Sequence, residues 1–433
     1  MRNSSSADPG TEDDTQHQAL WRNRDYVAWW TGNTLSALGT SVSAIAYPLL
    51  VLFLTGSVGK AGLIGSANLI GILLTALWGG ALADRVSRRG ILIVGSLVET
   101  LTLGAVAALV RTGQAGLPVL AAAAFVSGLS AGVVLGASTP ALRRIVPKEQ
   151  LATANGQAMA RDMAAQLAGS PLGGFLFAAA HWLPFGADAL SYVCAAVGAL
   201  SIRRPLGPDR AAQPVPTTVT RDIVDGITFV KDQPFLRFVV LTASVVNMLE
   251  QAFLLLLIAT VRHRGGSPTT VGVVSSMMVV GGLLGSPFAS VVTRRFRARL
   301  LLSGAVWSIA AGVAASALVP QVWEIAAVVA LTQVAVVPVN VVLQTYVMQL
   351  IPDGFLGRVA AVNRFGAYAL EWSGPLLAGL LALLFGVPGG LLALLIIMIP
   401  LAVIVSVSRA LDVLDTPIGK VAELNTPGSP ARG

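Results

Sequence analysis

Long apolar stretches separated by short polar segments run through almost the whole chain. Twelve of them come close to or exceed the roughly 20 residues that a helix needs to cross a bilayer. They fall at about 26–55, 61–83, 90–110, 117–139, 151–180, 183–202, 235–260, 269–292, 299–319, 322–346, 358–386 and 388–408. Such stretches are too long for barrel strands, and a backbone inside hydrocarbon must satisfy its hydrogen bonds internally. The pattern predicts an all-α membrane protein with twelve transmembrane helices.

A longer polar segment, 203–234, follows the sixth stretch and is rich in proline and charge. It predicts two six-helix bundles at 26–202 and 235–408, with polar tails at 1–25 and 409–433. The bundles repeat short motifs at an offset of about 205 residues, since PKEQL at 147–151 corresponds to PDGFL at 352–356, and Pro171 to Pro375. We therefore expect two pseudo-symmetric bundles with a site between them.

The distribution of charge predicts the orientation of the chain in the membrane. Only 12% of the residues are charged, whereas 55% are hydrophobic. If both ends lie on one side, that side holds 23 of the 29 Lys and Arg residues and the other side four, while Arg161 and Arg364 fall inside stretches. Positive loops face the cytoplasm, so both termini are expected there. This bias explains the net charge of +8 without a nucleic-acid partner.

The sequence offers little for cofactor or enzyme chemistry. The single cysteine, Cys194, excludes a disulfide framework, and the three histidines have no metal-ligand spacing. We find no phosphate-binding loop and no nucleophile paired with a base. No cofactor, no metal and no enzymatic activity are therefore expected.

The segment after the second stretch carries the most specific motif. Residues 79–89 read GGALADRVSRR, with small residues before an Asp-Arg step and a basic pair. This segment resembles the signature loop of the major facilitator superfamily. The resemblance implies that Asp84 and Arg85 act in a cytoplasmic gate, with Arg358 as a partner. In the second half Ser290 stands where this aspartate would be, so a matching latch there is weaker or absent.

Further segments are similar to the drug:proton antiporters of that superfamily, in particular to macrolide and enterobactin exporters. They are SALGTSVSAIAYPLLVLFLTGS at 36–57, VPKEQLATANG at 146–156, DALSYV at 188–193 and LGRV at 356–359. Residues 374–379, GPLLAG, look like the Gly-Pro antiporter motif. The arginine that such exporters often carry in the fourth span is absent, because Ala124 lies near its place.

Charged side chains inside the stretches are candidates for proton coupling, because each costs about 2.5–3.5 kcal/mol at mid-membrane on insertion scales. Glu250 shares a helix face with Ser244, Asn247 and Gln251 and has no local cation. This makes it the better proton carrier of the three candidates, which are Glu250, Glu371 and Asp162. A static ion pair of Glu371 with Arg364 or Arg161 remains an alternative. Glu99 and Asp188 are expected to make packing or capping contacts.

Uncharged polar side chains follow one face of several stretches and predict a wet cavity. Spans one, four, seven and ten line the central cavity in the superfamily that the chain resembles. The residues that we expect to contact substrate are Asn33, Ser36, Tyr47, Arg161, Asn247, Gln251, Gln333, Asn340, Arg364, Tyr368 and Trp372.

Together these features predict a monomeric, proton-coupled exporter of a small amphipathic molecule, such as an antibiotic, in a bacterial cell membrane. It would work by alternating access. Two alternatives remain open. One is an exporter of a siderophore or lysolipid with the same fold, and the other is a membrane sensor that transports nothing.

Overall fold

The computed structural model describes residues 20–207, 227–350, 362 and 365–415 of the 433-residue chain. Within this part every regular element is a helix, which confirms the all-α prediction. The helices of the first half are α1 (Arg24–Thr55), α2 (Val58–Arg85), α3 (Arg88–Arg111), α4 (Leu117–Ile145), α5 (Leu151–Ala179) and α6 (Leu183–Ser201). The short helices η1 (Leu20–Arg22) and η2 (Lys148–Gln150) precede α1 and α5.

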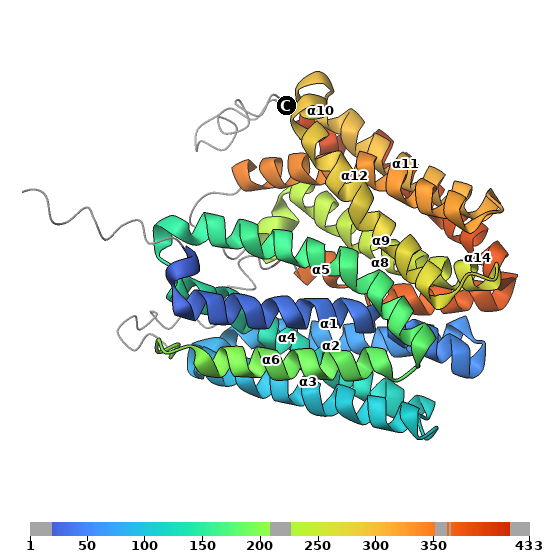
Figure 1. Ribbon diagram of the computed structural model, residues 1–433. Helices are drawn as coiled ribbons and strands as arrows, with labels where there is room; N and C mark the ends of the chain where they lie inside the picture. Colours follow the sequence, from blue (N-terminus) through green and yellow to red (C-terminus); the bar gives the residue numbers. More distant parts are fainter. Residues whose placement is uncertain (1–19, 208–226, 351–361, 363–364, 416–433) are drawn as a thin grey trace, which may run out of the picture.

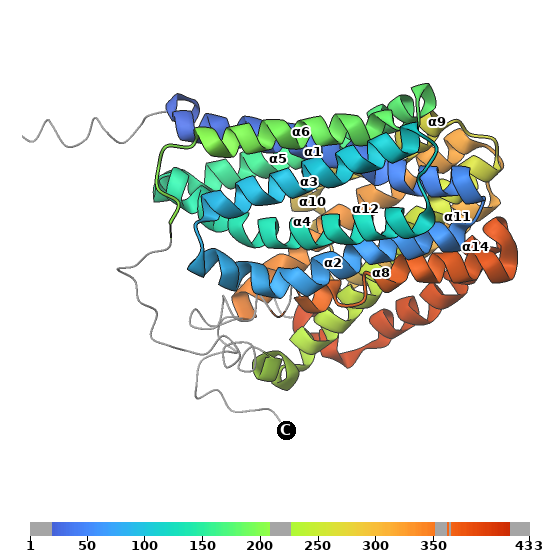
Figure 2. The ribbon, with the colours of Figure 1, turned by 90° about the horizontal axis from the view of Figure 1, so that it is seen from below.

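The second half repeats this arrangement with more interruptions. Its helices are α8 (Pro234–His263), α9 (Pro268–Gly285), η3 (Ser286–Phe288), α10 (Ala289–Arg295), α11 (Ala298–Leu318), α12 (Val322–Leu350), α14 (Ser373–Val407) and η5 (Arg409–Asp415). Figures 1 and 2 show the two groups of roughly parallel helices lying side by side, with α5 and α2 next to the second half.

Ten helices of the described chain are long and apolar enough to cross a membrane. One of these ten, Phe365–Val407, covers both the eleventh and the twelfth predicted span, because α14 is kinked at Gly386, where φ is 71°. The 29-residue helix α5, which carries Arg161 and Asp162, is not among the ten. Adding α5 and dividing α14 at its kink makes the architecture consistent with twelve spans.

Two sides of the molecule are named here by the helix ends that they carry. The linker side holds Arg24, where α1 begins, and Ser201, where α6 ends; the far side holds Gly56 and the start of α2. On the linker side the Asn23 side chain caps α1 by accepting the Asp25 and Tyr26 amides, and it donates to the Ile145 carbonyl of α4 at 2.9 Å. These bonds fix where the first helix starts against its neighbours.

Asp25 connects the start of α1 to the chain after α6, and its loss should destabilise the protein measurably. Its buried carboxylate accepts the backbone amides of Arg203 at 2.9 Å and Arg204 at 3.1 Å. Asp25→Ala would leave both amides without that acceptor, so we expect the free energy of unfolding to fall by about 2 kcal/mol. The control is Asp412, whose exposed carboxylate pairs with Arg299 at 2.7 Å. Asp412→Ala should change the free energy of unfolding by less than about 1 kcal/mol. Thermal unfolding in detergent measures both, and equal effects would contradict this prediction.

The two halves touch closely near the far side, through glycines. A Cβ placed on Gly62 of α2 would lie 2.1 Å from the Pro375 carbonyl oxygen of α14, and one on Gly272 of α9 would lie 2.1 Å from the Ser170 carbonyl oxygen of α5. Buried apolar side chains of both halves, including Leu49 and Leu256, join in one core cluster. The far side is therefore closed by direct contact between backbones.

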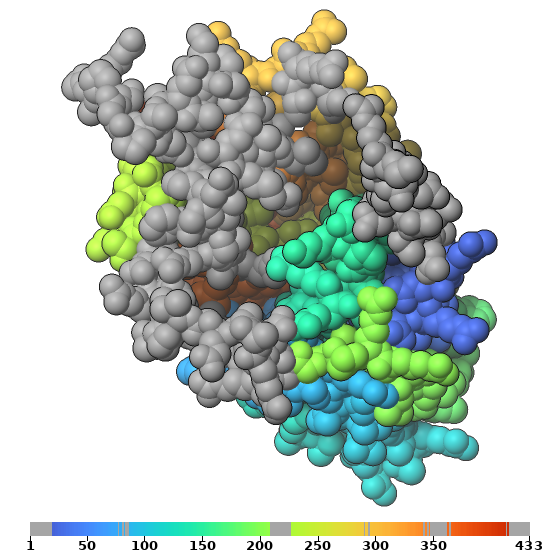
Figure 3. Space-filling view, turned by 90° about the vertical axis from the view of Figure 1, so that its left-hand side faces the viewer, coloured from blue at the N-terminus to red at the C-terminus, as the bar shows by residue number. Residues whose placement is uncertain are grey.

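Toward the linker side the halves separate. Viewed from that side, the molecule shows a recess between α5 and the helices of the second half (Figure 3). The strongest contacts between the halves are those of α5 with α9 and of α2 with α14. Among the described residues, the halves thus meet on the far side and lie apart on the linker side, as a carrier that alternates between two openings requires.

Candidate functional site

The second half contains a break in a membrane helix beside the recess. The chain is helical at Phe365–Tyr368, turns at 369–372 and becomes helical again at Ser373. In a continuous helix the Glu371 amide would bond to the Ala367 carbonyl, but here it donates to the Tyr368 carbonyl at 3.1 Å. The sequence predicted one unbroken span at 358–386, and this prediction was wrong at 369–372.

Side chains of α8 bond to two carbonyls beside this break, of which that of Gly366 also accepts the Ala369 amide. The Ser244 hydroxyl donates to the Gly366 carbonyl, and the Asn247 amide donates to the Ala367 carbonyl at 2.9 Å. Non-helical backbone at membrane depth is tolerated where protein groups or a wet cavity satisfy it. The polar face predicted for α8 therefore holds the broken segment in place, and Asn247 is engaged in that contact.

We expect Asn247→Leu to lower the free energy of unfolding by about 1–3 kcal/mol, because it leaves the Ala367 carbonyl without the donated bond. Asn68→Leu is a matched control: Asn68 also donates to a carbonyl at 2.9 Å, that of Ala124, but this carbonyl lies within the continuous helix α4. Its loss should cost about 1 kcal/mol or less. Thermal unfolding in detergent compares the two, and a larger loss in Asn68→Leu would rule out this role for Asn247.

Two carboxyl groups meet at the break. The Gln251 amide of α8 donates to Glu371 at 2.5 Å, and Glu250 lies near enough to Glu371 for their charges to repel. Glu250 is exposed and lies next in sequence to Gln251, the residue that bonds to Glu371. Neither group forms an ion pair within the described residues.

The third candidate acid has a cation beside it. The Arg161 guanidinium donates to Asp162 at 2.8 and 3.0 Å and lies over the Trp29 ring at 5.4 Å. The Arg161 side chain is 9% exposed and that of Asp162 51%. Asp162 is therefore held in an ion pair, whereas Glu250 forms none among the described residues. Arg161 pairs with Asp162 and not with Glu371.

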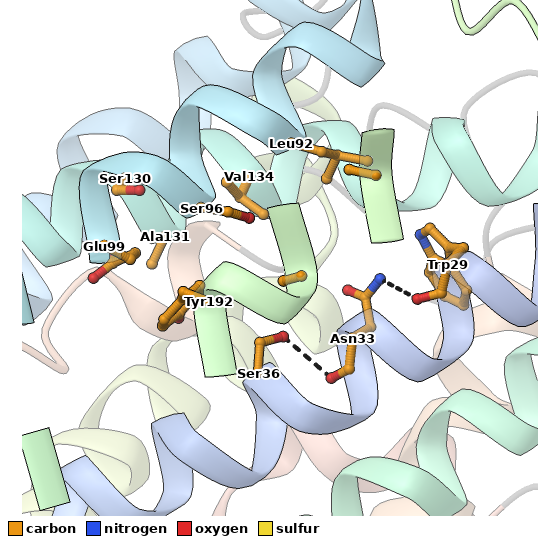
Figure 4. Close-up of a pocket in the computed structure, with 12 residues that line it drawn as sticks. Trp29, Asn33, Ser36, Leu92, Ser96, Glu99, Ser130, Ala131, Val134 and Tyr192 are labelled. Atoms are coloured by element: carbon orange, nitrogen blue, oxygen red, sulfur yellow. Dashed lines mark hydrogen bonds between the residues drawn. The ribbon is translucent and has the colours of Figure 1, made fainter. Parts of the chain in front are cut away.

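The candidate residues of α1 lie elsewhere than predicted. Asn33 and Ser36 line a cavity of about 60 Å³ inside the first half, between α1, α3, α4 and α6 (Figure 4). The Tyr47 ring packs edge-on against Phe185 of α6 at 4.9 Å. These three side chains face the interior of their own bundle, so we no longer assign them to substrate binding between the halves.

The remaining candidates divide into described and undescribed positions. Gln333 is half-buried and Asn340 exposed on one face of α12, Tyr368 is half exposed, and Trp372 caps the start of α14. Arg358 and Arg364 lie outside the described residues. Asp84 and Arg85 form the last turn of α2, but their side chains are not described. The latch between these three gate residues stays a prediction.

Two acids that the sequence assigned to packing or capping are buried with no ion pair among the described residues. Glu99 of α3 is 4% exposed and Asp188 of α6 is 2% exposed. The sequence did contain a signal for both acids, since any ionisable side chain inside a membrane helix is a candidate for a functional role.

The architecture defines the class of protein: two bundles of membrane helices around a recess, with a broken helix beside it, form a multi-pass membrane transporter. A family model described as transmembrane secretion effector matches residues 16–425, and the chain belongs to this family of the major facilitator superfamily. This confirms the resemblance seen in the sequence.

Similar proteins agree with this assignment. The chain is 28% identical over 381 residues to the multidrug efflux pump Tap of Mycolicibacterium fortuitum, covering 84% of this chain and 91% of that protein. Tap of Mycobacterium tuberculosis H37Rv is also 28% identical, over 378 residues, with coverage of 83% and 87%.

Solved structures share the fold at low identity. A bacterial homologue of human Spinster, inward-facing and occupied, gives a TM-score of 0.69 at 13% identity, with 90% of this chain and 97% of that chain covered. A bacterial homologue of ferroportin, inward-facing, gives 0.65 at 17%, with 90% and 100% covered. The chain is thus a multi-pass bacterial membrane protein related to efflux pumps.

Proposed function

We propose that this protein exports a small amphipathic molecule in exchange for protons. The observation that carries the proposal is the acidic pair of Glu250 and Glu371 at the helix break, and we place the exposed Glu250 carboxyl group at the recess between the halves. A charged side chain at this depth is costly unless it has a task. The efflux pumps among the relatives support export of a drug-like molecule.

The mechanism that we propose is alternating access with the linker side in the cytoplasm. The excess of basic residues on that side supports this orientation. Substrate enters the recess from the cytoplasm, beside Gln251, Tyr368 and Trp372, and an amine-bearing amphipath would compete with the proton for Glu250. Protons from the opposite side neutralise the acids and favour the return of the two halves.

Both halves of the recess come from one chain, so we propose that a monomer suffices. Asp84, Arg85 and Arg358 are proposed to close the cytoplasmic gate when the far side opens. In this cycle the far-side glycine contacts and the cytoplasmic latch exclude each other, as alternating access demands.

Purified protein in liposomes with an imposed pH gradient tests the proposal. We expect gradient-dependent movement of at least one amphipathic antibiotic or dye from a panel that also holds a siderophore and a lysolipid. If only the siderophore or only the lysolipid moved, that compound would be the substrate class, and export of a drug-like molecule would be wrong. Movement that ignores the pH gradient would overturn proton antiport, and no movement of any compound would overturn the transport proposal.

A further inference from the structure

The first bundle holds two acids that the proposed export mechanism does not use. Glu99 of α3 accepts a hydrogen bond from the Ser127 hydroxyl of α4 at 2.8 Å. Asp188 of α6 accepts one from the Ser191 hydroxyl at 3.1 Å and lies beside Ser43 of α1. The two carboxyl groups, named here the carboxyl pair, are close enough to interact electrostatically.

Among the described residues, no cation compensates the charge of the carboxyl pair. The titratable groups that face it are the phenols of Tyr47 on α1 and Tyr192 on α6, and α4 contributes only serine hydroxyls. The ion pairs formed within the described residues all involve other acids. Two neighbouring carboxylates without a cation, buried in apolar surroundings, cannot both stay ionised at low cost.

A cavity extends from Glu99 of this pair in the direction of the linker side. The cavity of about 60 Å³ is lined by Glu99 at one end and Trp29 at the other, with Asn33, Ser36, Ser96 and Tyr192 between them (Figure 4). A water needs roughly 10–15 Å³ of such volume and two to four polar partners, so several waters fit. The buried Trp29 indole N–H has no hydrogen-bond partner in the part of the chain that the structure describes, and a water in this cavity would satisfy it.

We propose that Glu99 and Asp188 form a second proton-binding site, inside the first bundle, which exchanges protons with the linker side through this cavity. The pair holds a proton at neutral pH and releases it to cavity water at alkaline pH, leaving a carboxylate that Ser127 or Ser191 stabilises. Proton binding here does not depend on Glu250 or Glu371, which lie in the second half.

The pair is also placed to affect the contact between the halves. Asp188 packs against the α1 backbone at Gly39, where a Cβ would lie 2.4 Å from its Oδ1. Two residues further along α1, Ser41 packs against Gly169 of α5, and α5 in turn contacts α9 of the second half. A change of charge at Asp188 therefore acts on the helix that supports the far-side closure.

Infrared difference spectra of the purified, reconstituted protein between neutral and alkaline pH, where exposed carboxyl groups are already ionised, test the site directly. A protonated carboxyl group has a carbonyl stretch that an ionised one lacks. We expect Glu99→Gln and Asp188→Asn each to remove part of the titrating band, whereas Glu149→Gln, at an exposed position of η2, leaves that band intact. Ser127→Ala, a milder change, should keep the band and move its midpoint to higher pH, because a bond to the ionised form is lost.

Two results would overturn the inference. One is a titrating band that is unchanged in Glu99→Gln, Asp188→Asn and Ser127→Ala; the other is a band of the pair that persists to alkaline pH, which would mean a permanently neutral, structural contact. A Glu250→Gln, Glu371→Gln double variant separates this inference from the proposed function. If this double variant lost coupled export but kept the Glu99 band, the second site would be supported independently of the export mechanism. If coupled export depended on Glu250 and Glu371 but no Glu99 band were found, only the second site would be overturned.

Discussion

Glu250→Gln is expected to abolish uphill export while leaving exchange of substrate across the membrane intact. Glutamine resembles the protonated acid in shape and hydrogen bonding but cannot release a proton. The variant should therefore still open and close around substrate, yet gain nothing from a pH gradient. Among the described residues Glu250 forms no ion pair that would keep the wild-type carboxylate permanently charged.

The size of the effect follows from the free energy of the gradient. One proton moving down a gradient of one pH unit releases about 1.4 kcal/mol, which sustains at most about a tenfold concentration ratio of a neutral substrate. Wild-type protein in liposomes should approach this ratio, and Glu250→Gln should show no accumulation. Counterflow of labelled substrate, without any pH gradient, should remain within about twofold of the wild type because the binding surface is retained.

Two further variants make this prediction decisive. Glu149→Gln removes an exposed acid of η2 and should leave both assays unchanged. Glu371→Gln removes the acid that Gln251 already holds, so we expect a smaller loss of accumulation than in Glu250→Gln. Full accumulation in Glu250→Gln, or loss of counterflow together with accumulation, would show that Glu250 does not carry the coupling proton.

Much of the fold could be predicted from the sequence because lipid leaves few choices. An apolar run of about 20 residues has to be a helix, so the predicted spans and the observed helices of the first half agree to within a few residues at most ends. Helix starts also have local signals, such as Ser57, Ser87 and Ser267, whose hydroxyls accept amides in the first turns of α2, α3 and α9.

The helix break at 369–372 could not be predicted in the same way. Hydropathy averages over a window, and the apolar residues around Glu371 resemble those of a continuous span. Pro375 was a partial signal, because proline is favoured in the first turn of a helix and disfavoured further inside. The side chains that support the break lie far away in sequence, since Ser244 and Asn247 of α8 bond to the Gly366 and Ala367 carbonyls beside it.

The direction in which the polar face of α1 points could not be predicted from the sequence either. Polar residues in a membrane helix avoid lipid, but a polar stripe satisfies this rule equally well inside its own bundle or between the two bundles. Asn33 and Ser36 take the first option, where they line the cavity that reaches Glu99. These two orientations are distinguished only by the packing of α1 between α5 and α6. That packing cannot be deduced from a local sequence pattern.

Gly62→Ala and Gly272→Ala are expected to stop transport by preventing closure of the far side. In each case the new Cβ would lie 2.1 Å from a backbone carbonyl oxygen of the opposite half, that of Pro375 or of Ser170. A backbone atom cannot rotate away as a side chain does, so the helices would have to part by about 1 Å or more in an interface that is otherwise close-packed. The state shown here would lose stability relative to one with an open far side.

Distances between the halves report this shift directly. Spin labels on Lys60→Cys and Leu383→Cys, both at exposed positions near the far side, in a Cys194→Ser background, should move apart in Gly62→Ala and in Gly272→Ala. Transport in liposomes should fall to the level of protein-free vesicles. The two interfaces are related by the pseudo-symmetry of the halves, so either substitution alone should suffice.

Gly65→Ala supplies the matched control, one turn further along the same face of α2. Its Cβ would lie 3.4 Å from the Pro375 side chain, which is ordinary contact, so closure and transport should both persist. If Gly62→Ala also left the label distance and the transport rate unchanged, the backbone contacts would not limit the cycle. If Gly65→Ala were as damaging as Gly62→Ala, the loss would come from α2 itself, since glycine to alanine inside a helix otherwise stabilises it by roughly 0.5–1 kcal/mol. Loss of transport in Gly62→Ala together with normal transport in Gly65→Ala is expected only if the close approach of the two halves, and not a property of α2 itself, limits closure.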